Sequence, residues 1–250
     1  MKNSDDSGYT GKHVGVCVLD TGIFPHIDFT GRILAFQDFI GHRIRPYDDN
    51  SHGTHVCGII GGDGRASEGR IRGIAPGCSL IVLKVLDRTG NGRKEDVLQA
   101  FRWILENKRY YGLRVVNISV GTTCRRAEDH RVLIAGVEQL WDAGLVVVAA
   151  AGNQGPKAGS VTAPGSSRKI ITVGSSDLLT GRTAISGRGP TFEAEQPDTE
   201  EILKEIRSVA DVLKNPDVGY EAKGNLIRSV VEQIIYDKES GKMSFDIIIS

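Results

Sequence analysis

The fold class is decided by residues 14–22, which read VGVCVLDTG. The first six residues are almost all aliphatic or β-branched and lack the polar alternation of a strand with one face in water. They predict a strand that is buried on both faces, as in a parallel sheet covered by helices. Asp20 follows directly and would stand at the carboxyl end of that strand, where sites gather in such sheets.

Further apolar runs of the same kind occur along the chain, each ended by Gly, Asp, Asn or Thr. They are residues 80–86, 115–120, 145–151 and 170–173. Apolar residues recur at helical spacing over residues 97–105 and 133–141, and Gly112 and Gly144 follow as stop signals. Strands that alternate with helices predict an α/β fold, a doubly wound parallel sheet with helices on both faces.

The composition excludes several classes of protein. The 31 basic residues cancel the 31 acidic ones, so no basic field over the whole chain favours nucleic acid or an anionic membrane. No apolar stretch approaches the roughly 18 residues of a membrane span, and the N-terminus does not read as a secretory signal. Cys17, Cys57, Cys78 and Cys124 are too sparse for a disulfide scaffold. We therefore expect reduced thiols and a cytoplasmic location.

The composition changes near residue 192. Residues 1–192 hold 28 of the 31 glycines and a net charge of +6, whereas residues 193–250 hold 3 glycines and a net charge of −6. We expect an incomplete α/β domain over residues 1–192 and an unrelated helical tail over residues 193–250. Apolar spacing in the tail predicts helices over residues 202–213 and 226–235, then a terminal hairpin or strand over residues 243–249.

The first candidate catalytic group is Asp20, in the Asp-Thr-Gly turn that ends the first strand. A structural aspartate that caps a turn is an equally good interpretation of this motif alone. The same tripeptide surrounds the paired aspartates of aspartic peptidases, but this chain has one copy and would need a homodimer.

The second candidate is His52, in the sequence HGTHVCG at residues 52–58. Glycine beside it allows backbones to pass closely, and a helix that begins here would bring its positive end near the imidazole. That would disfavour the charged form and leave His52 as a neutral base. A helix-capping histidine is one alternative, and a zinc site from His52, His55 and Cys57 is another. Zinc is disfavoured because no fourth ligand stands nearby and no HExxH motif is present, so we predict no metal ligand.

The third candidate is Asn153, which follows the small residues AAAG at positions 149–152. Small side chains allow a substrate to approach the strand end, and an asparagine amide can donate to a developing oxyanion. By itself, however, Asn after Gly is also typical of an ordinary turn.

Together, an orienting acid, a base and an amide donor in this order resemble the subtilisin family of serine endopeptidases. The separation of Asp20 and His52 matches that family's spacing of about 32 residues. Further matches are GIAP at residues 73–76, KVL at 84–86, ISVG at 118–121, ITVG at 171–174 and ISGRGP at 185–190. TGRI at residues 30–33 and YDDN at 47–50 are most similar to intracellular subtilases of Gram-positive bacteria. The resemblance covers about residues 8–192.

The resemblance implies a role for each candidate. Asp20 would hold the imidazole of His52 in the right tautomer, His52 would move the proton of the serine, and Asn153 would bind the oxyanion. Two segments would flank an extended peptide substrate. They are Ser119, Val120 and Gly121, and Ala150, Ala151 and Gly152.

The resemblance implies no cofactor for catalysis. Asp28 resembles a position that sometimes ligates calcium, which leaves a structural calcium ion as one interpretation. One carboxylate does not make a site, and a solvated surface aspartate is the simpler alternative.

The sequence does not supply the nucleophilic serine. The family places it in a Gly-Thr-Ser-x-Ala turn, and no such string occurs in the chain. The family spacing from Asn153 points to about residue 219, where residues 216–222 read PDVGYEA. Ser208 and Ser229 are nearest and lie within the predicted tail helices. The nucleophile is thus unknown, and we expect the chain as written to be inactive or nearly so.

Two functional hypotheses follow. The first is a serine endopeptidase of the subtilisin family that acts on peptides or proteins, with no nucleic acid or membrane as partner. The second is a non-catalytic protein that holds a peptide along residues 119–121 without cutting it. The tail, with NLIRSVVE at residues 225–232, weakly resembles the C-terminal end of large serine recombinases. An inserted mobile element and an unrelated helical extension are both compatible with it.

Overall fold

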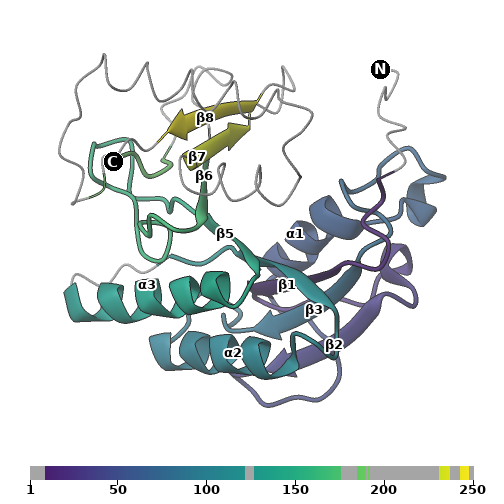
Figure 1. Cartoon of the computed structure of the whole chain (residues 1–250). Coiled ribbons are helices and arrows are strands. Elements are labelled where there is room, and N and C mark those ends of the chain that lie inside the picture. Colours follow the sequence, from purple (N-terminus) through teal and green to yellow (C-terminus); the bar gives the residue numbers. More distant parts are fainter. Residues whose placement is uncertain are drawn as a thin grey trace, which may run out of the picture. The chain divides into compact units, whose positions relative to one another are not determined.

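The computed structural model describes residues 9–121, 127–175, 185–189, 191, 231–236 and 243–247. The chain divides into two compact units (Figure 1). The first comprises Met1–Ser119 and Asp142–Val147, and the second comprises Val120–Trp141 and Val148–Ser250. The predicted acid and base therefore belong to the first unit, and the predicted amide donor belongs to the second.

The first unit is built on parallel strands in the order β2, β3, β1, β4. Their bounds are β1 (Gly15–Asp20), β2 (Ile33–Asp38), β3 (Ser79–Lys84) and β4 (Leu113–Ile118). All six residues of β1 are buried, as the continuous apolar run predicts. The parallel α/β sheet is confirmed, and β2 is a strand that the sequence analysis did not predict.

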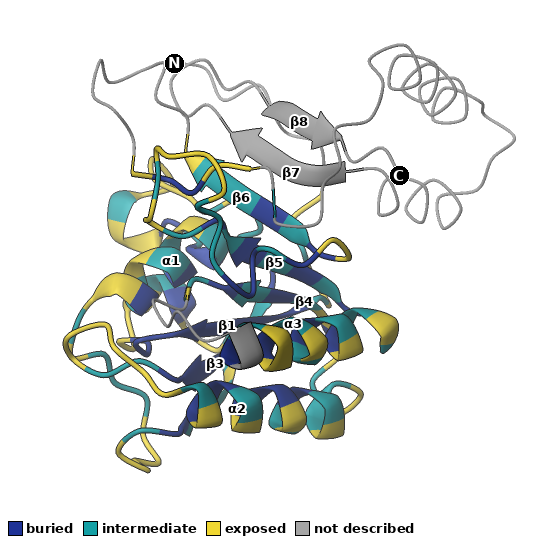
Figure 2. Cartoon of the chain, turned by 90° about the vertical axis from the view of Figure 1, so that its left-hand side faces the viewer, coloured by how far each residue is buried: buried dark blue, intermediate teal, exposed yellow. Residues whose placement is uncertain are grey.

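Helices cover both faces of these strands (Figure 1). Alternate side chains of a strand point to opposite faces, and α1 (His52–Gly61) packs against the face that carries Val16 and Val18. On the other face lies α2 (Lys94–Asn107), whose buried residues include Phe101 and Ile104. Figure 2 shows β1 and β3 in the colour of buried residues, with exposed residues along α2. Two short 3₁₀ helices, η1 (Ile27–Phe29) and η2 (Arg65–Ser67), complete the described elements of this unit.

The second unit has strands in the order β5, β6, β7, β8. It contains α3 (Ala127–Asp142) up to Trp141, most of β5 (Val146–Ala150), β6 (Ile171–Ser175), β7 (Val231–Tyr236) and β8 (Met243–Ile247). The β5–β6 and β6–β7 pairs are parallel and the β7–β8 pair is antiparallel. The predicted strands at residues 145–151 and 170–173 and the helix at 133–141 are thus confirmed.

The prediction of a second tail helix over residues 226–235 is wrong where the structure describes those residues. Residues 231–236, assigned to a second helix from their apolar spacing, form β7 between β6 and β8. The run VEQII is rich in β-branched residues, which favour strands when neighbouring strands are available for pairing. The predicted terminal strand is confirmed by β8. The helix expected over residues 202–213 and the boundary at residue 192 lie outside the described residues.

The cysteines Cys17, Cys57 and Cys78 are free and buried. Burial raises the pKa of each thiol, so all three stay protonated at neutral pH. Cys124 lies outside the described residues. Over the part of the chain that the structure describes, no helix combines the length and the apolar character needed to cross a membrane.

Candidate active site

Asp20 and His52 are brought into contact by the end of β1 and the start of α1. Nδ1 of His52 lies 2.7 Å from Oδ1 of Asp20. The Asp20 side chain is fully buried, whereas 51% of the His52 side chain is exposed. Because an ionised carboxylate can only accept, Nδ1 donates the proton in this contact and Nε2 is left as the free base. The pair therefore presents an oriented base to solvent.

The two carboxylate oxygens of Asp20 have different surroundings. Oδ1 also accepts a hydrogen bond from the backbone N–H of Thr21 at 2.7 Å. Oδ2 is buried and has no hydrogen-bond partner among the described residues. Burying an oxygen without a hydrogen-bond partner costs free energy. The carboxylate is therefore held by the two contacts of Oδ1 and by the backbone of Asp20.

Two glycines allow α1 to approach the end of β1. A Cβ atom on Gly53 would lie 2.2 Å from the carbonyl oxygen of Gly22 and 3.1 Å from Oδ1 of Asp20. Gly22 has a φ of 127°, and a Cβ there would lie 2.2 Å from the carbonyl oxygen of Tyr47. The expectation that glycine beside His52 permits close passage of backbones is confirmed.

Asp48 joins the turn after β1 to the start of α1, and the sequence analysis did not single it out. Oδ1 accepts hydrogen bonds from the Thr21 hydroxyl and from the backbone N–H groups of Asn50 and Ser51. Oδ2 accepts from both the backbone N–H and the hydroxyl of Thr54, at 2.9 and 2.6 Å. Burial raises the pKa of this carboxyl, but the hydrogen bonds, led by the Thr54 hydroxyl, outweigh burial and lower it.

This negative charge changes the expected electrostatics of His52. The sequence analysis relied on the positive end of α1 to disfavour the charged imidazole. Asp48 places a carboxylate at the same end of the helix, where it offsets that positive potential. Asp48 stands three residues before the N-cap residue Ser51, so no N-cap pattern in the sequence identifies it.

Lys84 is the other group near Asp20 that the sequence analysis did not identify as part of the site. It ends β3 opposite Asp20 in the β1–β3 register, and its side chain is 1% exposed. Its Nζ donates to the carbonyl oxygens of Thr21 and Leu86 at 2.5 and 2.8 Å and to Oδ1 of Asp49 at 2.7 Å. A lysine that ends an otherwise apolar strand is the signal that could have revealed it.

Tyr47 anchors the loop that leads to His52. Its hydroxyl donates to Oδ2 of the buried Asp38 at 2.8 Å. The guanidinium carbon of Arg43 lies 4.5 Å from the centroid of its ring, and Nζ of Lys84 lies 5.0 Å from it. Burial, and then the hydrogen bond with Asp38, raise the pKa of Tyr47 to about 12.

The residues named in the zinc alternative do not share a site. Cys57 is fully buried in the core beside Val16 and Val18, whereas His55 is exposed. Zinc binds thiolate, and burial raises the pKa of the Cys57 thiol. Over the described residues, no group of three or more His, Cys, Asp and Glu side chains could hold a metal ion.

Asp28 also does not fit a calcium ion, and it is not the solvated surface residue that was the simpler interpretation. Its side chain is 17% exposed, and Oδ1 accepts the backbone N–H of Ala66 at 2.7 Å. Arg32 donates to the carbonyl oxygen of Asp28 and lies 3.8 Å from Asp63, which also pairs with Arg65. Two arginines thus lie beside the oxygens of Asp28 and Asp63, whereas calcium needs six to eight oxygen ligands.

In the second unit, Asn153 is exposed in the turn after β5. Gly152 before it has a φ of 84°, a conformation that favours glycine. A Cβ on Gly152 would lie 2.1 Å from the hydroxyl of Thr162, and a Cβ on Gly121 would lie 2.5 Å from the same hydroxyl. This hydroxyl is buried and has no hydrogen-bond partner among the described residues. The oxyanion role of Asn153 stays a prediction.

The backbone of the AAAG run is used within the fold. Ala151 donates to the carbonyl oxygen of Val173 at 2.8 Å and accepts from Thr162 at 3.1 Å, and Gly152 accepts from Gly187 at 2.8 Å. These backbone groups of Ala151 and Gly152 already have partners within the fold, and contact of residues 150–152 with a peptide stays a prediction. The strand predicted over residues 115–120 ends at Ile118, so Ser119, Val120 and Gly121 lie beyond it. Their contact with a peptide stays a prediction.

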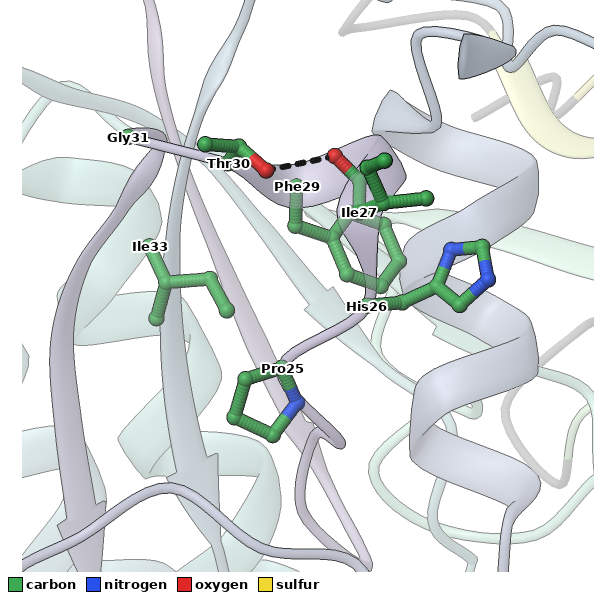
Figure 3. Close-up of a pocket in the computed structure, with 7 residues that line it drawn as sticks. All are labelled: Pro25, His26, Ile27, Phe29, Thr30, Gly31 and Ile33. Carbon is green, nitrogen blue, oxygen red and sulfur yellow. Dashed lines mark hydrogen bonds between the residues drawn. The ribbon is translucent and has the colours of Figure 1, made fainter. Parts of the chain in front are cut away.

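A hollow of about 420 Å³ in the first unit contains none of the predicted site residues (Figure 3). Its lining consists of Pro25, His26, Ile27, Phe29, Thr30, Gly31 and Ile33. The Thr30 hydroxyl donates to the carbonyl oxygen of Ile27 at 2.7 Å. Nδ1 of His26, the one imidazole of the lining, accepts from the backbone N–H of Asp28 at 3.3 Å and lies 3.9 Å from Oδ1 of that residue, a longer contact than the one between His52 and Asp20.

Comparison with known proteins identifies the family. Residues 11–204 match the profile of the Subtilase family. Serine protease AprX of Bacillus subtilis (strain 168) is 40% identical over 76% of this chain, and Subtilisin DY of Bacillus licheniformis is 32% identical over 76%. The solved structure of Sphericase is 28% identical, with a TM-score of 0.62 over 75% of this chain and 63% of its own. The chain spans 46% of the length of AprX and 66% of that of Subtilisin DY. The chain belongs to the subtilase family.

Proposed function

We propose that this chain carries the acid and base of a subtilisin-type serine endopeptidase that hydrolyses peptide bonds in peptides or proteins. The observation that carries the proposal is the 2.7 Å contact between Nδ1 of His52 and Oδ1 of the buried Asp20. It leaves Nε2 as a base on an exposed imidazole, which is the arrangement that activates a serine hydroxyl.

The proposed chemistry is that of a serine peptidase, with Asn153 assigned to the oxyanion from the sequence resemblance. Nε2 of His52 takes the proton of the serine hydroxyl while its oxygen attacks the scissile carbonyl, and Asp20 stabilises the imidazolium that forms. The Asn153 amide donates to the resulting oxyanion. The imidazolium then returns the proton to the leaving amine as the peptide bond breaks, and a water molecule deprotonated by His52 hydrolyses the acyl-serine that remains. No metal or organic cofactor takes part in these steps.

The nucleophile is the part of the proposal for which the chain has no candidate. Its 250 residues contain no Gly-Thr-Ser-x-Ala string. In the proposed reaction the serine therefore comes from outside these residues. Without it, loss of turnover by a factor of about 10⁶ is expected.

This absence favours a second candidate function, a non-catalytic peptide-binding protein. The small residues Gly121 and Gly152, which approach the same Thr162 hydroxyl, would form one wall of its binding site. Such a protein would hold an extended peptide and leave it uncut.

Three finer proposals concern lineage and location. The TGRI and YDDN segments support kinship with intracellular subtilases of Gram-positive bacteria, and the buried free thiols support a cytoplasmic location. The change in glycine content and charge at residue 192 supports a foreign origin of residues 193–250, for which the end of a large serine recombinase is our proposed source. The net charge of −6 on that segment argues against binding to nucleic acid.

The test supplies the missing serine in trans. The 250-residue chain, His52→Ala and the matched control His55→Ala, which changes an exposed histidine one helical turn away, are incubated with labelled casein and with an active-site phosphonate. Each is tested alone and with a C-terminal fragment of a subtilase, selected because its sequence contains a Gly-Thr-Ser-x-Ala turn. We expect no labelling or cleavage by the chain alone, and both activities with the fragment in the wild type and His55→Ala but not in His52→Ala.

Three outcomes would separate the candidate functions. Cleavage by the chain alone, abolished in His52→Ala, would overturn the absence of a nucleophile while supporting the peptidase. A stable complex with the fragment that cleaves nothing would contradict the peptidase proposal. Binding of a fluorescent casein peptide under those conditions would favour the peptide-binding protein.

A further inference from the structure

We propose that Lys84 is a positioning residue for the Asp20–His52 pair. Its buried ammonium group fixes the end of β1 and the loop before α1 in the geometry that makes the 2.7 Å contact. The inference rests on the proposed function, in which that contact orients the base, but its test reads the contact itself and not hydrolysis.

The burial of Lys84 has to be compensated by its partners. A lysine ammonium is rarely fully buried, because removing its charge from water is unfavourable unless the group is paired and hydrogen-bonded. Here the side chain is 1% exposed, and each of the three donors of Nζ has an acceptor, two carbonyl oxygens and Oδ1 of Asp49. This complete set of partners fixes the ammonium at one point.

One of these contacts acts on Asp20 through its neighbour in the chain. The carbonyl oxygen of Thr21 accepts from Nζ of Lys84, while the N–H of Thr21 donates to Oδ1 of Asp20. Lys84 therefore fixes the backbone of Thr21, whose N–H group in turn fixes the Asp20 carboxylate. The Thr21 hydroxyl is held independently, since it donates to Asp48 and accepts from the N–H of Gly53.

The backbone after Lys84 acts on Asp20 directly. The N–H groups of Val85 and Leu86 donate to the carbonyl oxygen of Asp20 at 3.0 and 3.2 Å. The carbonyl oxygen of Leu86 in turn accepts from Nζ of Lys84. The ammonium group of Lys84 thus holds Leu86 in place, and the N–H groups of Val85 and Leu86 fix the backbone of Asp20.

The third contact of the Lys84 ammonium is with the loop that precedes His52. Asp49 lies three residues before His52, and its carboxylate pairs with Lys84 at 2.7 Å. The ring of Tyr47 in the same loop lies 5.0 Å from Nζ. One ammonium group therefore links the strand end that carries the acid to the loop that leads into the base.

The test measures the proton between Nδ1 of His52 and Oδ1 of Asp20 by NMR. A proton in a short hydrogen bond to a carboxylate resonates far downfield of other imidazole protons, and the signal is assigned by its absence in His52→Ala. Lys84→Met removes the ammonium and keeps an apolar chain of similar length. Leu83→Ala is the matched control, because it removes a fully buried side chain from the same strand without touching Thr21 or Asp49.

We expect Lys84→Met to lose the downfield signal and Leu83→Ala to keep it, although both variants unfold at a lower urea concentration than the wild type. A signal retained in folded Lys84→Met would overturn the inference. A signal lost in both variants would also overturn it, because any weakening of β3 would then suffice.

Asp49→Ala keeps the inference testable if Lys84→Met does not fold. Because the Asp49 side chain is 41% exposed, water can replace its carboxylate beside Nζ, whereas Lys84→Met leaves two carbonyl oxygens and that carboxylate without their donor. We expect the downfield signal to move upfield relative to the wild type, and an unchanged signal would overturn the inference. Failure of the chain to cleave casein in the presence of the serine-bearing fragment, while this signal is intact, would contradict the proposed function and leave this inference standing.

Discussion

At the scale of single residues, Asp48 shows how a charge can stabilise the fold at one pH and not at another. Its carboxylate accepts five hydrogen bonds at the start of α1, and together they lower its pKa against the effect of burial. A carboxyl whose folded pKa is depressed contributes stability above its unfolded pKa of about 4. That contribution is lost as the pH falls through the lower folded value.

We predict that Asp48→Asn lowers the free energy of unfolding by about 2 kcal/mol at neutral pH, since an amide cannot accept from all of these donors. The difference from the wild type should shrink as the pH falls below about 4. Urea unfolding at neutral and acidic pH measures it. Glu106→Gln, on an exposed position of α2, is the control and should have little effect. A difference that is constant over this pH range would contradict the prediction.

The same residues show what the sequence could and could not reveal about the site. Asp20 and His52 were predictable because a buried strand and a glycine-flanked helix start carry local signals. Asp48 and Lys84 were not identified because their importance depends on which partners the fold brings to them. Lys84 meets Thr21 only through the β1–β3 register, 63 residues apart in the chain.

At the scale of elements, Gly53 and Gly58, two of the three glycines of α1, have opposite expected effects when they are replaced by alanine. A Cβ on Gly53 would lie 2.2 Å from the backbone of Gly22, whereas a Cβ on Gly58 would have nothing within 4 Å. Gly53→Ala should lower the free energy of unfolding by about 2 kcal/mol or more through overpacking. Gly58→Ala should raise it by up to about 1 kcal/mol, because alanine favours helix.

Thermal unfolding of the two variants measures this difference. The pair forms its own control, since the same methyl group is added to the same helix one and a half turns apart. Equal changes in the two midpoints would show that α1 shifts freely and does not depend on the close approach to Gly22.

The loop that contains η2 gives a second prediction at this scale. The Asp28 carboxylate accepts the N–H of Ala66, and Arg32 lies beside Asp28 and Asp63. We predict that added calcium does not raise the midpoint of thermal unfolding through this loop. Arg32→Ala should lower the midpoint without any calcium. A rise with calcium that is abolished in Asp28→Asn would contradict the prediction.

The strands that the sequence analysis missed or misassigned have a common cause. Residues 33–38 of β2 read ILAFQD and have a mixed burial pattern, so they lack the continuous apolar run that revealed β1. Residues 231–236 have apolar spacing compatible with a helix, and only pairing with β6 and β8 decides for a strand. Local periodicity carries no information about available strand partners.

At the scale of the whole molecule, the tail contributes strands to the sheet of the second unit. β7 pairs with residues 172–175 of β6, and β8 pairs with β7. The composition change at residue 192 therefore did not predict where the sheet would end. Glycine content and charge distinguish segments of sequence, but they do not determine which backbones form hydrogen bonds.

We predict that deletion of residues 231–250 causes self-association. The deletion leaves the backbone groups of β6 without the partner that β7 supplies, and an unpaired strand edge pairs readily with another chain. Light scattering after size-exclusion chromatography measures the effect. Deletion of residues 248–250 alone is the control, because it retains both strands. A monomeric 1–230 chain would contradict the prediction.

Tyr47 sets an upper limit on the alkalinity that the loop before α1 can withstand. A free phenol ionises near pH 10, whereas burial and Asp38 raise the pKa of Tyr47 to about 12. The protonated phenol thus stabilises the fold fully below pH about 10, and this contribution vanishes as the pH rises through about 12. Above that pH the tyrosinate of Tyr47 and the Asp38 carboxylate, which had shared a 2.8 Å hydrogen bond, repel each other. The ultraviolet signature of tyrosinate would then report the release of this loop as it happens.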